Sequence, residues 1–120
     1  MATLGLTTTL LSSNVQTDKL SMTLTDSLVT TEPSRGLSRE TITTADNQEI
    51  LDNALSAAMY VYVKNLDPTN FVILQTTASE VWGRLNPGEF IFFCIAPSIG
   101  LEVRADTASC IVEYAYWTKA

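Results

Sequence analysis

Hydrophobic and polar residues alternate along most of the chain, which is the pattern of β-strands that bury one face. The alternation is clearest over residues 19–28, where four large apolar residues point one way and serine and threonine point the other. These four residues are Leu20, Met22, Leu24 and Leu28. A weaker version of the pattern occurs in residues 4–10, and the β-branched run 41–44 also favours a strand. The stretch Glu32–Gly36 contains proline, serine and glycine and predicts a turn.

Beyond residue 58 the pattern predicts consecutive strands separated by turns. The expected strands are residues 58–64, 71–74, 80–85, 90–95, 101–104 and 110–117. Between two of them, Asn86–Glu89 places proline and then glycine at the centre of a four-residue segment, which is typical of a type II turn. Eight or nine short strands with such spacing indicate an all-β fold, an antiparallel β-sandwich of the jelly-roll type, although the strand order stays open.

The segments 46–57 and 1–15 are less regular than the rest of the pattern. In residues 46–57, Asp46 and Glu49 resemble a helix-capping pair, but a strand over 48–52 followed by a loop suits the neighbouring β pattern better. We expect one domain over residues 1–120. The threonine-rich residues 1–15 are expected to form an extended N-terminal arm that lies on a neighbouring molecule and adds strands to its sheet.

Several of the late strands are apolar on both faces, which exceeds what a solvated sandwich needs. Phe90, Phe92 and Cys94 alternate with three further apolar residues. An aromatic side chain buries about 150–250 Å². The apolar area that four or five outward-pointing rings expose is therefore larger than the largest apolar patch of a typical monomer. We therefore expect the chain to form homo-oligomers. The expected interface residues are Tyr60, Tyr62, Phe71, Trp82, Phe90, Phe92, Tyr114, Tyr116 and Trp117.

Composition excludes several classes of function. The 13 acidic and 7 basic residues give a net charge of −6, which disfavours nucleic acid as a partner. No apolar run is long enough to cross a membrane as a helix, so no membrane partner is expected. The chain has no histidine and shows no nucleophile elbow, phosphate-binding loop or metal-ligand spacing. We expect neither enzymatic activity nor a cofactor or metal.

Three single residues are candidates for chemistry. Cys94 and Cys110 lie among apolar residues and are expected to be buried free thiols, with a disulfide between them as the alternative. Glu113 is the only charge within its apolar strand. It is expected to lie at an edge or rim, with an ion pair to an arginine such as Arg84 or Arg104 as the alternative.

Four segments carry a resemblance to a known class of proteins. They are Tyr60–Asp67, Asn70–Val72, Gly83–Phe90 and the C-terminal stretch that runs from Leu101 to Tyr116. In their succession of strand and turn residues, over roughly residues 37–118, they resemble small virion proteins of tailed bacteriophages, especially those that infect cyanobacteria and marine bacteria. The resemblance transfers no individual functional residue.

The resemblance implies a β-sandwich structural component of the virion. Small acidic β proteins of such particles commonly serve as decoration or cement proteins on the capsid exterior. They are often trimeric and sit between subunits of the major capsid protein. The expected function is therefore a capsid cement protein, with a homotrimer favoured. The alternative is a tail, neck or fibre component, and the exposed tyrosine and tryptophan rings would then allow it to bind glycans.

Overall fold

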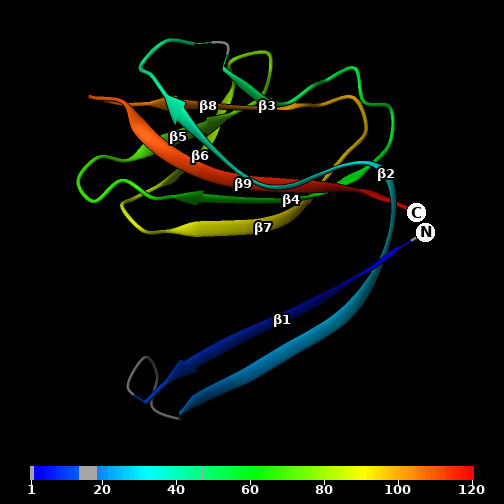
Figure 1. Cartoon of the computed structure of the whole chain (residues 1–120). Helices are drawn as coiled ribbons and strands as arrows, with labels where there is room; N and C mark the ends of the chain where they lie inside the picture. The colour runs from blue at the N-terminus through cyan, green and yellow to red at the C-terminus, as the bar shows by residue number, and fades with distance from the viewer. Residues whose placement is uncertain (1, 14–18, 47) are drawn as a thin grey trace.

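The computed structural model describes residues 2–13, 19–46 and 48–120, and all regular secondary structure in them is β-strand (Figure 1). Nine strands occur in this part of the chain. They are β1 (Ala2–Ser12), β2 (Leu20–Ile42), β3 (Glu49–Leu51), β4 (Met59–Asn65), β5 (Val72–Gln75), β6 (Val81–Leu85), β7 (Phe90–Ile95), β8 (Leu101–Ala105) and β9 (Cys110–Lys119). The expectation of an all-β fold is thus confirmed.

The strands form two antiparallel sheets with jelly-roll topology. One sheet has the order β1-β2-β9-β4-β7 and the other has the order β3-β8-β5-β6. Among strands β2 to β9, the first in sequence pairs with the last, the second with the last but one, and so on: β2 with β9, β3 with β8, β4 with β7 and β5 with β6. This is the pairing of a long hairpin that is rolled into two layers. Strand β1 adds a fifth strand beside β2, outside this eight-stranded roll.

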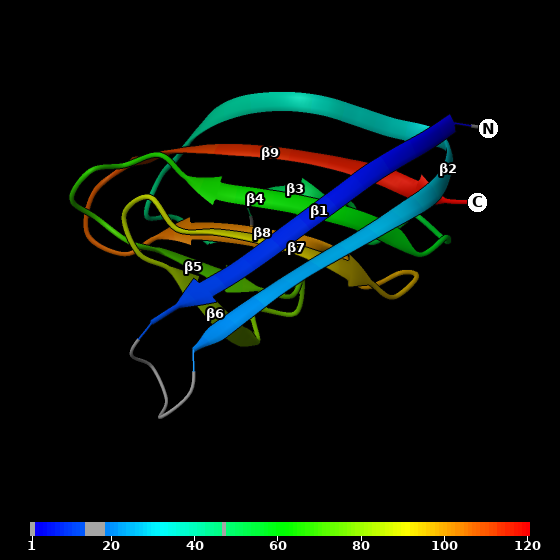
Figure 2. The same cartoon turned by 90° about the horizontal axis from the view of Figure 1, so that it is seen from below.

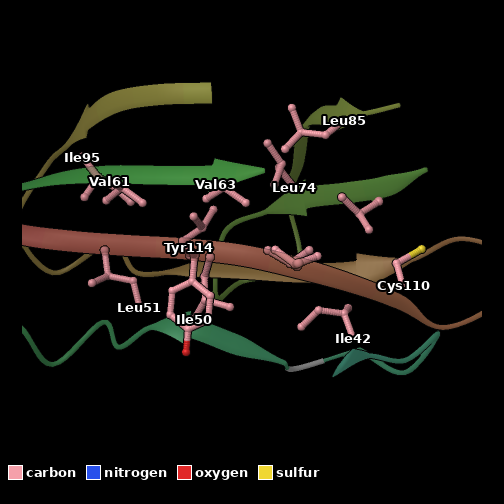
Figure 3. Packing of buried hydrophobic residues seen from close by; sticks show 14 of the residues in the cluster. Ile42, Ile50, Leu51, Val61, Val63, Leu74, Leu85, Ile95, Cys110 and Tyr114 are labelled. Carbon is pink, nitrogen blue, oxygen red and sulfur yellow. The ribbon is translucent and has the colours of Figure 1, made fainter. Parts of the chain in front are cut away.

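The core lies between the two sheets and consists mainly of aliphatic side chains (Figure 3). Strand β4 sends Val61 and Val63 inward, with 1% and 0% of their surface exposed. Leu74 of β5 and Leu101 of β8 meet them from the opposite sheet. These residues are the apolar half of the predicted alternation, and their burial is the main stabilising contribution to the fold.

The predicted turn at Glu32–Gly36 is wrong, because this stretch lies inside the 23-residue strand β2. The pairing of β2 with β9 shifts register between Thr31 and Ser34 and again between Arg35 and Ser38. Both shifts are bulges or irregularities of the ladder, so Pro33 and Gly36 need no regular pairing partner there. The run 41–44 is accordingly not a separate strand, because Thr41 and Ile42 end β2 and residues 43 and 44 follow it outside any strand.

The other local predictions agree with the structure. Strand β3 is followed by a loop, so residues 46–57 form a strand and a loop, apart from residue 47, which lies outside the described residues. The turn at Asn86–Glu89 closes with a 3.0 Å hydrogen bond from the Glu89 N–H to the Asn86 carbonyl. Gly88 has a φ of 79° there, a conformation that glycine adopts without strain.

Strand β1 and the first half of β2 form a long hairpin that projects away from the sandwich, and we call it the arm (residues 2–12 and 20–31) (Figure 1). All eleven residues of β1 pair with β2, from Ala2 opposite Thr30 to Ser12 opposite Leu20. Seen from below, the arm runs diagonally across β7 (Figure 2). The predicted N-terminal arm is thus a hairpin that includes part of β2, and residues 1, 14 and 15 of the prediction lie outside the described residues.

Candidate assembly surface

The face of the five-stranded sheet that points away from the core carries a group of aromatic side chains, which we call the outer face. In β7, Ile91, Phe93 and Ile95 pack on the core, so the alternating residues point outward. Strands β4 and β9 contribute their outward residues beside them. The aromatic members of the outer face are Tyr60, Tyr62, Phe90, Phe92 and Trp117. The predicted doubling of apolar faces is confirmed for this sheet.

The outer face is covered at one end and open at the other. Tyr60 is only 8% exposed, and its ring lies nearly parallel to that of Phe92, with ring centroids 6.3 Å apart. The ammonium group of Lys119 lies 5.3 Å from the Tyr60 ring centroid, within the range of a cation–π contact. Phe90, at the other end of β7, is 65% exposed. The aromatic rings are therefore most exposed at Phe90, whereas at the other end Cys94, opposite Tyr60, is exposed beside a buried ring.

The base of the arm provides the cover. Leu28 and Thr30 are buried, whereas Val29 between them is exposed, so one side of the arm faces inward. Leu4 pairs directly with Leu28 and lies on the same side, followed by Leu6. A cleft of about 340 Å³ separates this side from the outer face, with Leu4–Thr9 on one wall and Tyr62, Phe90, Phe92 and Trp117 on the other.

The apolar side of the arm continues past the cleft to the far end of the hairpin. Alternation places four more apolar residues on the side of Leu28, together with Asp26, which pairs with Leu6. We call the apolar row the arm strip: Leu4, Leu6, Leu10, Leu20, Met22, Leu24 and Leu28. In its outer half, Leu10 is 47% exposed, Met22 37% and Leu24 56%. The opposite side of the arm carries mostly threonine and serine, together with Leu11 and Val29. The arm is thus an amphipathic hairpin whose apolar side is partly exposed in its outer half.

A polar cluster on β4, β9 and β2 borders the outer face. The Tyr62 hydroxyl donates a 2.9 Å hydrogen bond to Glu113 Oε1, and Arg39 Nε donates one of 3.1 Å to Oε2. Burial, together with the adjacent Glu113, raises the pKa of Tyr62 to about 12. The same hydrogen bonds from Tyr62 and Arg39 lower the pKa of Glu113. Glu113 therefore has an arginine partner, which is Arg39 and not Arg84 or Arg104. The expectation of an edge position is wrong, because β9 lies between β2 and β4 in the sheet.

The remaining predicted interface residues occupy different parts of the molecule. Tyr114 is 2% exposed and belongs to the chain's own core, where its hydroxyl donates to Glu40 Oε2 at 3.1 Å. Tyr116 is half-buried and packs against the same core. Phe71 is half-buried under Arg84, whose guanidinium carbon lies 3.8 Å from the ring centroid. Of the nine predicted residues, five thus gather on the outer face and these three do not.

Trp82, the last of the nine, joins the edges of the two sheets. It is 45% exposed and contacts Phe93 of β7, with ring centroids 5.2 Å apart and planes tilted by 60°. Strand β6 is an edge of one sheet and β7 an edge of the other. The Trp82–Phe93 contact therefore closes one side of the sandwich and leaves part of the indole ring in solvent.

The two cysteines are both free thiols, but only one is buried. Cys110 is 1% exposed, whereas Cys94 is exposed on the outer face. The prediction that both thiols are buried is therefore wrong for Cys94, because residue alternation turns it away from the core. Burial, with a smaller contribution from the charge of Asp67, raises the pKa of the Cys110 thiol.

Metal sites, membrane helices and cavities are the other candidate features of the molecule. Within residues 2–13, 19–46 and 48–120, no three or more aspartate, glutamate or cysteine side chains gather in a way that could hold a metal ion. In the same residues, no helix is long and apolar enough to cross a membrane. A cavity of about 450 Å³ lies beside the polar cluster and is lined by Arg39, Asp67 and Ile111 among others.

The sequence indicated the aromatic wall of the cleft but not the wall formed by the arm. The alternation over residues 19–28 did identify the apolar side of β2. The pairing of β1 with β2 as a hairpin was not predicted, because the register of two strands also depends on residues that lie outside both strands. Arg39 was missed as the partner of Glu113, since 74 residues separate them in sequence.

Comparison with known proteins leaves the chain without a relative from which a role could be transferred. No family model matches it, and no curated protein or solved structure matches it either.

Proposed function

We propose that this chain is a non-enzymatic structural protein of a tailed-bacteriophage particle. In this role it is a capsid decoration or cement protein that bridges neighbouring subunits of the major capsid protein. One observation carries the proposal: the arm extends an unpartnered apolar strip beyond the chain's own core, beside an aromatic face that is open at Phe90. Such a shape suits attachment to another subunit and offers no chemistry for turnover.

The energetic argument concerns the outer half of the arm strip. Burial of a leucine-sized side chain contributes about 1.5–3 kcal/mol, so leaving Leu10 and Leu24 half-exposed forgoes a contribution that a partner would restore. On a lattice the same contact recurs at every equivalent position. Many weak contacts of one kind would then stabilise a shell without any strong individual bond.

Charge and fold class are consistent with this role. The net charge of −6 suits the outside of a shell and disfavours contact with packaged DNA. Jelly rolls also occur in viral capsid and lectin domains. This likeness of architecture is an analogy and adds no evidence on function by itself.

A second candidate is a tail, neck or fibre component that binds glycans, and the exposed ring of Trp82 favours it. A free indole face can stack on a sugar ring. However, Trp82 already contacts Phe93 and helps to close the sandwich, which also explains its position. We therefore favour the capsid role. A saccharide screen in which Trp82→Ala abolishes binding would reverse this preference.

The direct test is the number of copies in purified particles, measured by quantitative mass spectrometry against a labelled standard of this chain. The cement role predicts hundreds of copies per particle. Particles stripped of the chain should break at a lower temperature, and adding the purified chain should restore them. A handful of copies would place the chain in the tail or neck, and its absence from particles would reject the proposal.

A further inference from the structure

We propose that the arm closes like a strap on the outer face of its own chain, and that Figure 1 shows the arm in its open position. In the closed position the arm strip packs against the aromatic rings on the other side of the cleft, which are Tyr62, Phe90, Phe92 and Trp117. The inference concerns a single copy of the chain and does not rest on the proposed function. It adds a position of the arm in which the chain covers its own apolar surface.

The cleft between the arm and the outer face is the first argument. Both of its walls belong to this chain, residues 4–9 on the arm and four aromatic side chains on the sandwich. With a volume of about 340 Å³, the cleft has room for several water molecules between walls that are largely apolar. Direct contact of the two walls would remove their apolar surface from water, which is favourable. Closure therefore has a driving force that needs no second molecule.

The base of the arm already makes the contact that closure would extend. Leu28, at the base, is 9% exposed, whereas Leu24 on the same side of β2 is 56% exposed. On β1, Leu4 is half-buried opposite Leu28, and Leu10 further along is 47% exposed. The arm diverges from the sandwich with distance from its base (Figure 1). The closed position therefore continues an existing packing of the strip along the same face.

The attachment of the arm allows this movement. The pairing of β2 with β9 begins at Thr30, and the Ala120 N–H donates a 3.0 Å hydrogen bond to the Val29 carbonyl. From Leu28 outward, β2 pairs with β1, and the sheet is two strands wide. A ribbon of two strands twists more than a wide sheet and is only marginally stable in water unless it packs on another surface. The pivot therefore lies near Val29, and the ribbon beyond it gains stability from closure.

The charges on the two surfaces favour their approach. Strand β1 carries no charged side chain, and the one charge on the strip side of β2 is Asp26. Among the described residues, the outer face carries Lys64, Lys119 and the ion pair of Arg39 with Glu113, which leaves a net positive charge. Closure thus brings a single carboxylate toward a face of opposite charge, and the leucines meet rings without the desolvation of a like-charged pair.

The test is single-molecule energy transfer at subnanomolar concentration, where each chain is observed alone. One dye is attached at Leu11→Cys, on the side of the arm that faces away from the cleft. The other is attached at Thr44→Cys, an exposed position in the loop that leads from β2 to β3 of the other sheet. Cys94→Ser removes the exposed native thiol, and Cys110 is buried. Closure brings the arm toward the sandwich, so it should raise the transfer efficiency.

Two further chains carry one more substitution each, Leu24→Asp or the matched control Thr23→Asp. These neighbours lie at the same distance along the arm but on opposite sides of it, and only Leu24 belongs to the arm strip. Both are exposed in the open position, so circular dichroism should stay close to that of the unmodified chain. If the arm stayed open, the two substitutions would have the same effect on transfer.

The expected result is that most molecules of the labelled chain and of the Thr23→Asp control show a higher efficiency than the open position in Figure 1 gives. Leu24→Asp should lower the ratio of closed to open molecules by at least about tenfold, because an aspartate forfeits the burial of leucine and must lose its own hydration. An efficiency equal to that of the open position in the labelled chain overturns the inference. Equal efficiencies in the Leu24→Asp and Thr23→Asp chains also overturn it.

The inference and the proposed function can fail separately. An arm that is always open rejects the strap but leaves the cement role standing if the chain occurs in particles in hundreds of copies. A chain whose arm closes as described but that is absent from particles retains the strap and rejects the virion role. Where both hold, a partner in the particle competes with the outer face for the arm strip and shifts the arm to its open position.

Discussion

Tyr62 and Glu113 form a hydrogen-bonded pair that joins β4 to β9 at the border of the outer face, with 2.9 Å between the hydroxyl and the carboxylate. They are not directly opposite each other, because Tyr62 pairs with Ala115 and Lys64 pairs with Glu113. The bond is therefore a diagonal cross-strand contact. Arg39 of β2 binds the second carboxylate oxygen, so three strands meet at one carboxylate.

This pair predicts an unusual tyrosine titration. The pKa of Tyr62 is raised to about 12 in the folded chain, from 10.0 ordinarily, first by burial and then by Glu113. The folded state thus keeps a proton that the unfolded state loses, and this contribution to stability, complete below pH 10, should decline between about pH 10 and pH 12. Burial and Glu40 raise the pKa of Tyr114 as well, so ultraviolet titration of phenolate should show late tyrosines, one of which is lost in Tyr62→Phe.

The Glu113→Gln variant separates the two causes. Removing the negative charge should lower the pKa of Tyr62, but burial should keep it above 10. An unchanged titration in this variant would show that the carboxylate does not act on Tyr62.

Two glycines with similar backbone angles should differ in their tolerance of alanine. Gly88 has a φ of 79° with open space where a Cβ would lie, so Gly88→Ala should cost only the left-handed strain of about 1–2 kcal/mol. At Gly100, with a φ of 72°, a Cβ would lie 2.7 Å from Thr77 Cγ2 and 2.9 Å from the Asn53 nitrogen. Gly100→Ala should therefore be clearly more destabilising in urea unfolding. Equal losses would contradict this packing.

Leucine truncation should distinguish the core from the arm. Leu74 is 1% exposed, and its Cδ1 atom lies 3.6 Å from the point where a Cβ would stand if residue 83 were not glycine. Leu74→Ala should therefore lower the free energy of unfolding by about 2–5 kcal/mol. Leu11→Ala, at 71% exposure, should change it by less than about 0.5 kcal/mol. Chemical denaturation of both variants at low protein concentration measures the contrast. A large loss from Leu11→Ala would mean that the opposite side of the arm is packed.

The two thiols should react at very different rates. Cys94 is exposed, whereas Cys110 is buried and has a raised thiol pKa, so it offers less thiolate at pH 8. A thiol reagent should therefore modify one cysteine per folded chain and two after denaturation. Peptide mapping should find the early label on Cys94, and Cys94→Ser should abolish the fast phase. Rapid labelling of Cys110 in the folded chain would contradict its burial.

The strands that could be predicted from sequence are those whose partners bury one side completely. In β4, the alternation separates Val61 and Val63 from Tyr60 and Tyr62, and the valines are the side that faces the core. The alternation in β7 separates Ile95, which packs inward, from Phe90, which does not. The burial of every second residue can be recognised in a single sequence, so the all-β fold class could be predicted from it.

What could not be predicted depends on contacts between distant segments. Pro33 and Gly36 have turn chemistry, and only the irregular pairing of β2 with β9 lets them remain in a strand. Tyr60 and Tyr114 both alternate regularly, yet one lies on the outer face and the other in the core. Alternation separates the two sides of each strand but does not say which side a second sheet will cover. The strand order and the arm register require that knowledge.

The most direct test of association as the role of this chain is its molar mass in solution, measured by light scattering during size-exclusion chromatography over a range of concentrations. The account predicts a multiple of the 13.1 kDa chain mass at tens of micromolar, with three copies, about 39 kDa, favoured. Leu11→Asp should leave that mass unchanged, and Leu10→Asp with Leu24→Asp should reduce it to one chain. A mass of 13.1 kDa for the unmodified chain at every concentration would contradict the account.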